Sequence, residues 1–334
     1  MGSSHYEVRT MGFILRRLAF YLAAIFVAIS FNFIMPRLMP GNPVDALFAS
    51  AMGKMPPETL VAYKEMLGFV DGPLWKQYFI YIKSVLTWDL GPTIMLYPVQ
   101  VTDVLAAKVP WTVGLAGLST LIAVFIGVMI GTYASYNRGK FVDSFMPTFW
   151  AFVGAMPQAV TALFIFFLFA LTLRWFPLSY GANPDLDPAF SWIYISSILH
   201  HGVLPLMSMV LGGIGAWIFN MRNAMINVLG EDFITMAKAK GLSSRRIMTH
   251  YAARNAILPV VTGISMQIGF VMAGAIFIET VFNYPGLGLL MFKSLESRDY
   301  PTMQACLLLI VVFVLIANFI ADLLYLWLDP RLRN

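Results

Sequence analysis

The chain has 334 residues, of which 59% are hydrophobic and only 12% are charged. A soluble domain is nearer a quarter charged, so the composition excludes an ordinary soluble protein and indicates a polytopic membrane protein. The formal net charge of +5 fits basic residues at the cytosolic face of a membrane protein far better than it fits nucleic-acid binding.

Apolar stretches long enough to cross a membrane, which takes about 20 helical residues, occur six times. They are roughly 14–36, 111–135, 145–173, 203–221, 257–280 and 303–328. Lipid cannot satisfy the exposed backbone groups of an open sheet, so we expect an all-α polytopic membrane fold. The first stretch is too long for the apolar part of a secretory signal, so we expect a retained helix. We expect the ten residues before it to be unstructured.

The distribution of charge predicts the orientation. Six spans put both termini on one side, and both the short loop 136–144 and the C-terminal Arg331-Leu332-Arg333 are basic. The positive-inside rule therefore predicts cytosolic termini. The expected layout is a cytosolic tail 1–13, a first helix 14–36, a large extracytoplasmic loop 37–110 with short helices, a five-helix region 111–328 and a cytosolic tail 329–334.

The large loop contains two helical patterns. Residues 57–68 begin with proline and end with glycine, as a short helix does. Residues 74–86 carry apolar side chains at helical spacing, which predicts an amphipathic helix lying on the outer leaflet or on the helix bundle. The loop either caps the helix ends or takes a direct part in receiving substrate.

Glycine and proline residues within the spans predict close helix contacts and bends. Gly127 and Gly131 permit close helix contact. Met146-Pro147 and Met156-Pro157 predict a kink in the third span. Gly212, Gly213 and Gly215 allow the fourth span to pack tightly or to bend.

A polar stretch, 231–246, lies between the fourth and fifth spans. It has too many charges to lie in lipid, and its apolar residues are spaced too regularly for a flexible linker. Apolar residues recur in it at helical spacing: Phe233, Ile234, Ala237, Leu242 and Ile247. Gly241 can take the left-handed conformation that ends a helix, and Ser243 or Ser244 can cap the next one. The pattern predicts two short helices that form a cytosolic docking surface.

Catalytic motifs are absent from the sequence. There is no phosphate-binding glycine loop and no zinc-hydrolase or serine-hydrolase motif. No metal site is predicted either, because the adjacent His200 and His201 are more typical of interfacial side chains. Acidic residues such as Glu279 and Asp322 lie only near span ends, whereas an ion-coupled carrier needs buried acids or broken helices. The sequence therefore predicts a membrane path whose energy comes from another subunit.

Motifs along almost the whole chain resemble those of the permease subunits of ABC importers, in the oligopeptide, dipeptide and nickel branch. Within that branch, the resemblance is to the first of the two paired permeases. The motifs are Met39-Pro40-Gly41-Asn42-Pro43, Asp89-Leu90-Gly91, Ala237-Lys238-Ala239-Lys240-Gly241-Leu242, Arg254-Asn255-Ala256, Glu279-Thr280-Val281-Phe282, Pro285-Gly286-Leu287-Gly288, Asp299-Tyr300-Pro301 and Asp329-Pro330-Arg331. One departure lies in the outer loop. The family often has Gly-Asp-Leu-Gly followed by a serine two residues on, whereas this chain has Trp88-Asp89-Leu90-Gly91-Pro92-Thr93.

The resemblance implies a type I importer permease fold with a coupling loop 222–256 that docks on an ATPase. The coupling residues it implies are Thr235, Ala237, Lys238, Ala239, Lys240, Gly241, Leu242, Ser243, Arg245 and Arg246. The outer gate or loop residues it implies are Glu279, Phe282, Pro285, Gly286, Gly288 and Asp299. A competing interpretation of the basic loop is contact with anionic lipid heads.

The implied partners are a sister permease, two cytosolic ATPases, an extracytoplasmic binding protein and membrane lipid, in a bacterial or archaeal plasma membrane. ATP and magnesium belong to the ATPases, and this chain is expected to bind no cofactor and to catalyse no reaction. The expected cargo is an oligopeptide or dipeptide. Oligosaccharide import by the same machinery, a secondary carrier and a structural or assembly protein are the alternatives.

Overall fold

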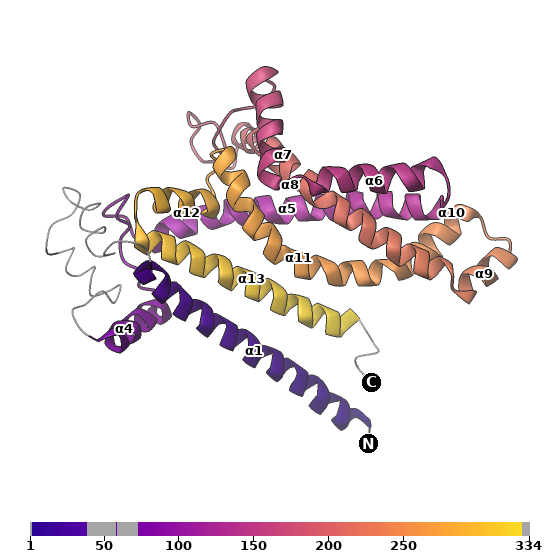
Figure 1. Ribbon diagram of the computed structural model, residues 1–334, viewed down its shortest axis with the longest axis horizontal. Helices are drawn as coiled ribbons and strands as arrows, with labels where there is room; N and C mark the ends of the chain where they lie inside the picture. Colours follow the sequence, from indigo (N-terminus) through magenta and orange to yellow (C-terminus); the bar gives the residue numbers. More distant parts are fainter. Residues whose placement is uncertain (1, 39–57, 59–72, 329–334) are drawn as a thin grey trace. The chain divides into compact units, whose positions relative to one another are not determined.

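The computed structural model describes residues 2–38, 58 and 73–328 (Figure 1). The helix expected at 57–68 and the tail 329–334 lie outside these residues, apart from position 58. The long elements are helices: α1 (Gly2–Leu38), α4 (Leu74–Thr87), α5 (Val101–Tyr136), α6 (Phe141–Ala155), α7 (Gln158–Ile165), α8 (Trp192–Leu229), α11 (Arg254–Val281), α12 (Leu287–Glu296) and α13 (Tyr300–Leu328). No strand occurs among the described residues, which confirms the all-α prediction.

Helices long and apolar enough to cross a membrane number four in the described chain. They are Ile14–Met35 within α1, α5, α8 and Tyr300–Ile320 within α13, and α6 with its continuation makes a fifth if the bent pair is one span. The remaining predicted span, 257–280, falls inside α11. The structure thus shows a multi-helix apolar protein, and the count of six spans stays a prediction.

Several helices extend beyond the predicted spans. α1 begins at Gly2, so the expectation of ten unstructured residues is wrong. α5 begins at Val101 and α8 runs from Trp192 to Leu229, where spans 111–135 and 203–221 were expected. Hydropathy detects only the lipid-facing part of a helix, whereas the helix itself ends where capping groups end it. The Ser191 hydroxyl, for example, accepts a hydrogen bond of 3.3 Å from the Tyr194 N–H at the start of α8.

The third predicted span is broken rather than continuous. α6 and α7 meet at an angle of 95°, and Met156 between them has extended backbone angles (φ −70°, ψ 134°). Pro157 causes the break because proline disfavours helical geometry in the residue before it and cannot donate to the helix. The predicted kink is confirmed at Met156-Pro157, whereas Pro147 lies inside α6 without breaking it. A π-helix, η1 (Phe166–Thr172), continues from α7.

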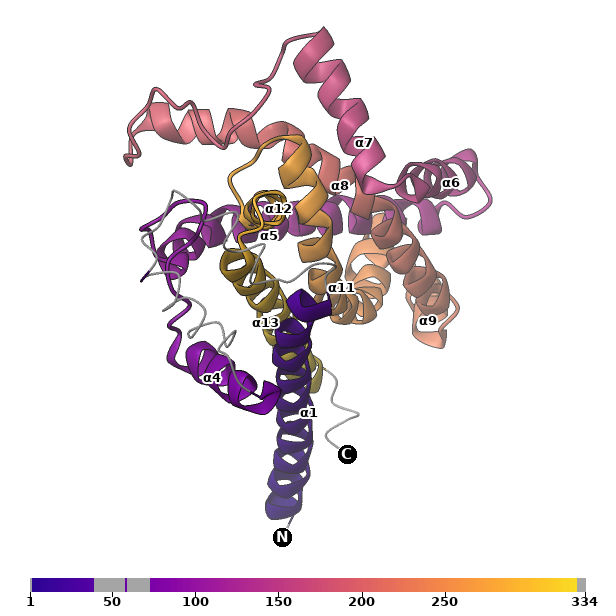
Figure 2. The same ribbon diagram turned by 60° about the vertical axis from the view of Figure 1, so that its left-hand side comes forward.

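The chain divides into two compact units, Met1–Val113 with Asn283–Phe319 and Gly114–Phe282 with Ile320–Asn334. In the first unit α1 and α13 run side by side, and α4 lies against α1 (Figures 1 and 2). One apolar face of α4 packs on the helices through a cluster of Ile29, Phe33, Tyr81, Val85 and Leu308. The predicted amphipathic helix is confirmed, and it lies on the bundle.

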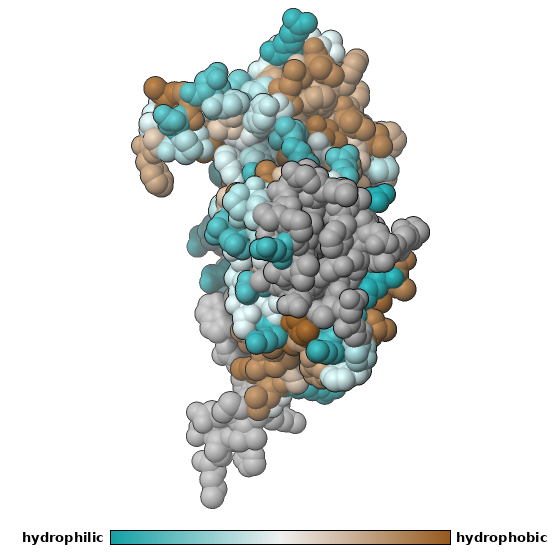
Figure 3. All heavy atoms as spheres, turned by 90° about the vertical axis from the view of Figure 1, so that its left-hand side faces the viewer, coloured by the Kyte–Doolittle hydropathy of each residue, from teal (hydrophilic) through white to brown (hydrophobic). Residues whose placement is uncertain are grey.

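A second face of α4, next to the packed one, is also apolar. Trp75, Phe79 and Leu86 are exposed by 64%, 63% and 76%. Figure 3 shows brown, hydrophobic surface on the lower part of the face it draws. Aromatic and aliphatic side chains on the open face of a helix beside the membrane are typical of contact with the lipid interface.

In the second unit, glycines allow the helices to approach closely. A Cβ atom added to Gly131 of α5 would lie 2.7 Å from the Ile218 carbonyl oxygen of α8, and one added to Gly215 would lie 2.5 Å from the Trp150 oxygen of α6. The predicted contacts at these glycines are therefore confirmed, and α8 is the helix on which α5 and α6 pack.

Candidate functional site

The polar stretch between α8 and α11 folds into a helical knob, residues 230–253. It consists of α9 (Asp232–Ala239), a one-turn helix α10 (Ser244–Arg246) and a π-helix η2 (Ile247–Ala253) that leads into α11. Figures 1 and 2 show α9 turning back beyond the end of α8. The predicted arrangement of short helices around a glycine is confirmed.

Gly241 ends α9 in the left-handed conformation, with φ +70°. Its N–H donates to the Lys238 carbonyl (2.9 Å), and the Leu242 N–H donates to the Ala237 carbonyl (3.3 Å). These two bonds form a Schellman motif, which supplies donors to carbonyl groups at the helix end that have no partner within the helix. Ser243 occupies the N-cap position of α10, as predicted, but its side chain makes no capping hydrogen bond.

The inner side of α9 is anchored in an apolar core. Ile234 and Ala237 are almost fully buried, and they pack with Met225 of α8 and with Ile247 and Ala252 of η2. Because its buried side chains and its C-terminal turn are both fixed, α9 moves together with α8 and α11 and not as a flexible loop. The knob is therefore a rigid extension of two long helices.

The outer side of the knob combines positive charge with apolar surface. Of the predicted coupling residues, Ala237 is buried and Leu242 is half-buried, so these two hold the knob together. The others are exposed: Thr235, Lys238, Ala239, Lys240, Gly241, Ser243, Arg245 and Arg246.

Two exposed apolar side chains of α9 were missed as surface residues. Phe233 is 39% exposed and Met236 is 62% exposed. The helical spacing grouped Phe233 with Ile234 and Ala237, but a short helix buries only one narrow stripe, which Ile234 and Ala237 fill. The sequence did indicate this exposure, because α9 has more apolar residues than one buried stripe can hold.

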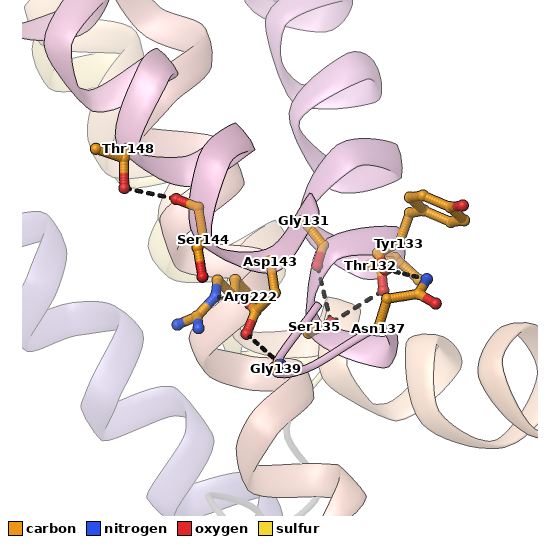
Figure 4. A network of polar contacts seen from close by, with 10 residues as sticks. All are labelled: Gly131, Thr132, Tyr133, Ser135, Asn137, Gly139, Asp143, Ser144, Thr148 and Arg222. Atoms are coloured by element: carbon orange, nitrogen blue, oxygen red, sulfur yellow. Dashed lines mark hydrogen bonds and ion pairs between the residues drawn. The ribbon is translucent and has the colours of Figure 1, made fainter. Parts of the chain in front are cut away.

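An ion pair braces the helix that carries the knob. The Arg222 Nε of α8 donates to Asp143 Oδ1 at 2.7 Å, and the Gly139 N–H donates to Asp143 Oδ2 at 3.1 Å. Figure 4 shows Asp143 between the guanidinium of Arg222 and the turn at Gly139. The sequence analysis did not single out Asp143 or Arg222 as partners, although an acidic residue in the basic loop that contains Arg138 and Lys140 was a usable signal.

A buried carboxylate organises the other predicted site, in the first unit. Asp299 is fully buried, and it accepts hydrogen bonds from the Thr93 hydroxyl, the Met95 N–H (3.0 Å) and the Thr302 hydroxyl (2.9 Å). Because a buried carboxylate needs such partners, Asp299 ties the segment before α5 to the start of α13. Thr93 was not predicted as its partner.

The other outer-gate residues are divided between the two units. Gly286 and Gly288 are buried at the start of α12, where the Leu287 N–H donates to the Thr112 hydroxyl at 2.7 Å. Pro285 is half-buried beside them. Glu279 and Phe282 are buried in the second unit, and the Phe282 ring lies edge-on to Phe166. A common gate formed by all of them stays a prediction.

Polar contacts also fix α4. Asn32 Nδ2 donates to the Tyr81 hydroxyl (3.1 Å) and to the Gln304 carbonyl (2.8 Å), and Gln304 Nε2 donates to the Asn32 carbonyl (2.8 Å). Burial raises the pKa of Tyr81 to about 12, so the phenol stays neutral at physiological pH. These bonds join α1, α4 and α13 into one body.

Metal-ligating side chains do not cluster in the described part of the chain: no group of three or more His, Cys, Asp or Glu lies together there. His200 and His201 lie within α8, where a ring nitrogen of each lies near a carbonyl oxygen, Trp175 (3.2 Å) and Ser197 (2.8 Å) respectively.

The fold and the knob together define a class of protein: a multi-pass helical membrane protein with a packed helical knob between two of its long helices. Residues 123–334 match the family model described as binding-protein-dependent transport system inner membrane component. The chain belongs to this family, and its place is the inner membrane.

Relatives align over nearly the whole chain. The oligopeptide transport system permease protein OppB of Haemophilus influenzae is 33% identical over 96% of this chain and 99% of its own length. The di/tripeptide transport system permease protein DppB of Pseudomonas aeruginosa is 32% identical over 97% and 99%. The dipeptide transport system permease protein DppB of Escherichia coli K12 is 32% identical over 96% and 98%.

Proposed function

We propose that this chain is a permease subunit of an ABC importer and forms half of the translocation path for oligopeptides or dipeptides. The observation that carries the proposal is the rigid knob between α8 and α11. An importer whose energy comes from a separate ATPase needs such a lever, because a flexible loop would absorb the movement of the ATPase without passing it to the helices. The names of the relatives support peptides as the cargo.

The outer side of the knob fits a protein groove better than a lipid surface. Lys238, Lys240, Arg245 and Arg246 supply charges for pairing with acidic residues. Phe233 and Met236 supply the apolar centre that a docking helix uses in a groove. The partner we propose is one cytosolic ATPase.

The full assembly in this proposal has two permeases, this chain and a sister permease, with two ATPases below and an extracytoplasmic binding protein above. Both termini and the knob face the cytosol, and six helices of this chain cross the membrane. The chain itself binds no cofactor and catalyses no reaction, since ATP and magnesium act in the ATPases.

Reconstitution tests this proposal. The complete complex in lipid vesicles, supplied with the binding protein, is expected to import a labelled peptide only when hydrolysable ATP is present on the knob side. Omitting the ATPases, or replacing ATP with a non-hydrolysable analogue, should abolish import. Import that persists without the ATPases would establish a secondary carrier instead, and import of an oligosaccharide in place of peptide would establish the alternative cargo.

A further inference from the structure

A polar cavity of about 250 Å³ lies in the second unit at the break between α6 and α7. Its lining comes from three directions: α5, the broken span and α8. The lining residues are Ser119, Thr120, Ala123, Gly154, Met156, Gln158, Met209, Gly212, Gly213 and Trp217. The knob and the Asp143–Arg222 pair do not contribute to it.

Uncharged hydrogen-bonding groups line this cavity. The hydroxyls of Ser119 and Thr120 donate to the Ala116 carbonyl (3.0 and 2.7 Å), which leaves their oxygen lone pairs as acceptors. The Gln158 amide adds two N–H donors and an oxygen acceptor. None of the described residues that line the cavity is charged.

Backbone groups add to this polar character. A helix leaves its last carbonyls and first N–H groups without intrahelical partners, and the break places two such helix ends, the C-terminus of α6 and the N-terminus of α7, beside the cavity. Gly154 and Gly213 lack side chains, and nothing lies closer than 3.9 Å to a Cβ atom added at either, so another chain can approach the backbone there. Gly212 is covered by the Gln158 side chain, whose Cγ lies 3.2 Å from a Cβ atom added there. Hydrocarbon does not tolerate interrupted backbone, which occurs at membrane depth only where it is buried in protein or lines a water-filled cavity. This face therefore does not face lipid.

We propose that this cavity is a transient subsite for the backbone of a peptide in transit, a proposal that rests on the proposed function. Donors and acceptors without charge match the amide groups that all peptides share, and they do not select among side chains. The volume is below the roughly 300–1,000 Å³ of sites that hold a whole drug-sized ligand, so the cavity accommodates one part of a peptide at a time. Weak, general contacts let the cargo leave again.

Two substitutions test the cavity. Gln158→Leu removes the amide at nearly constant volume, and Gly213→Leu fills the space. Gly202→Leu is the matched control, because Gly202 also lies on α8 and nothing lies within 4 Å of a Cβ atom added there. In the reconstituted complex, both cavity variants are expected to lower peptide uptake about tenfold, while Gly202→Leu stays within twofold of wild type. ATP hydrolysis stimulated by the loaded binding protein should stay within twofold in all three.

A modified cargo tests the chemistry directly. A peptide N-methylated at its central amide is expected to enter several-fold more slowly than the parent peptide through the wild-type complex, and at the parent's rate through Gln158→Leu. Equal preference in both complexes would overturn the subsite. So would wild-type uptake in Gln158→Leu.

The failures of the two proposals are distinguishable. If the assembled wild-type complex imports no peptide, the proposed function fails before any variant is considered. If wild type imports peptide and Gly213→Leu does not assemble, a peptide carrying a benzophenone decides: cross-links on α5, the α6–α7 break or α8 support the subsite, and cross-links confined to other helices overturn it.

Discussion

At the scale of single residues, the least replaceable positions are those where backbone geometry or burial leaves one chemical solution. Gly241 has a positive φ in the turn that ends α9, although open space surrounds it. Asp299 is buried with its oxygens fully engaged by donors. In both cases the requirement is set by the conformation and partners of the backbone nearby.

Replacing Gly241 with valine is expected to reduce binding-protein-stimulated ATP hydrolysis at least fivefold, with normal membrane insertion. A β-branched side chain in left-handed geometry costs about 1–2 kcal/mol, and this strain opens the Schellman turn that fixes α9. Gly230→Val is the control, since Gly230 is also an exposed glycine of the knob but has a negative φ (−84°), so valine there adds no left-handed strain. Equal loss of stimulation in both variants would contradict a specific role for the turn at Gly241.

Replacing Asp299 with alanine is expected to destabilise the first unit by about 1–3 kcal/mol or more, the cost of leaving buried donors without an acceptor. The Thr93 and Thr302 hydroxyls and the Met95 N–H would lose their acceptor. Thermal unfolding of the purified protein in detergent, and proteolysis between α4 and α5, measure the effect. Asp89→Asn, at an exposed position in the same region, should change the free energy of unfolding by less than about 0.5 kcal/mol; a similar small change for Asp299→Ala would refute the network's importance.

At the scale of elements, α8 connects most of the second unit. It packs on α6, α7 and α11, and Gly127 and Gly131 of α5 lie close against it. Its Arg222 pairs with Asp143, and its C-terminal end leads directly into the knob. A movement of the knob therefore reaches α5, α6 and α11 through one rigid helix, and the polar cavity lies against the same helix.

Replacing Gly131 with leucine is expected to disrupt assembly of the second unit, at a cost of several kcal/mol. The added Cβ would meet the Ile218 backbone oxygen and the Met221 Cβ, at 2.7 and 2.9 Å, and a backbone atom cannot rotate away. The control is Gly117→Leu on the same helix, where nothing lies within 4 Å of an added Cβ. Yield of monodisperse protein and its melting temperature report the difference, and equal values for the two variants would argue against close α5–α8 packing.

At the scale of the whole molecule, the proposed orientation places the knob and both termini on the cytosolic side, with the segment between η1 and α8 outside. The only cysteine, Cys306, is buried, so it can be replaced by alanine to give a background for single-cysteine labelling.

A cysteine at Ser243, which is exposed on the knob, should react with a membrane-impermeant thiol reagent only from the cytosolic side of oriented vesicles. A cysteine at Asp185, exposed between η1 and α8, should react only from the opposite side. Labelling of both from one side would overturn the orientation, and labelling after detergent is added controls for reagent access.

Several features were predictable from the sequence, because each depends on local pattern and backbone preference. They are the apolar helices, the helical fold, the amphipathic α4, the kink at Met156-Pro157 and the knob with its turn at Gly241. Tertiary structure alone decided which groups meet across the chain: Asp143 with Arg222, Thr93 with Asp299, and the Gln158 side chain with Gly212 of α8. Spacing along a helix predicts which face a residue occupies, but it does not predict which distant helix that face will contact. For that reason the knob could be found in the sequence, whereas the brace beneath it and the polar cavity at the broken span could not.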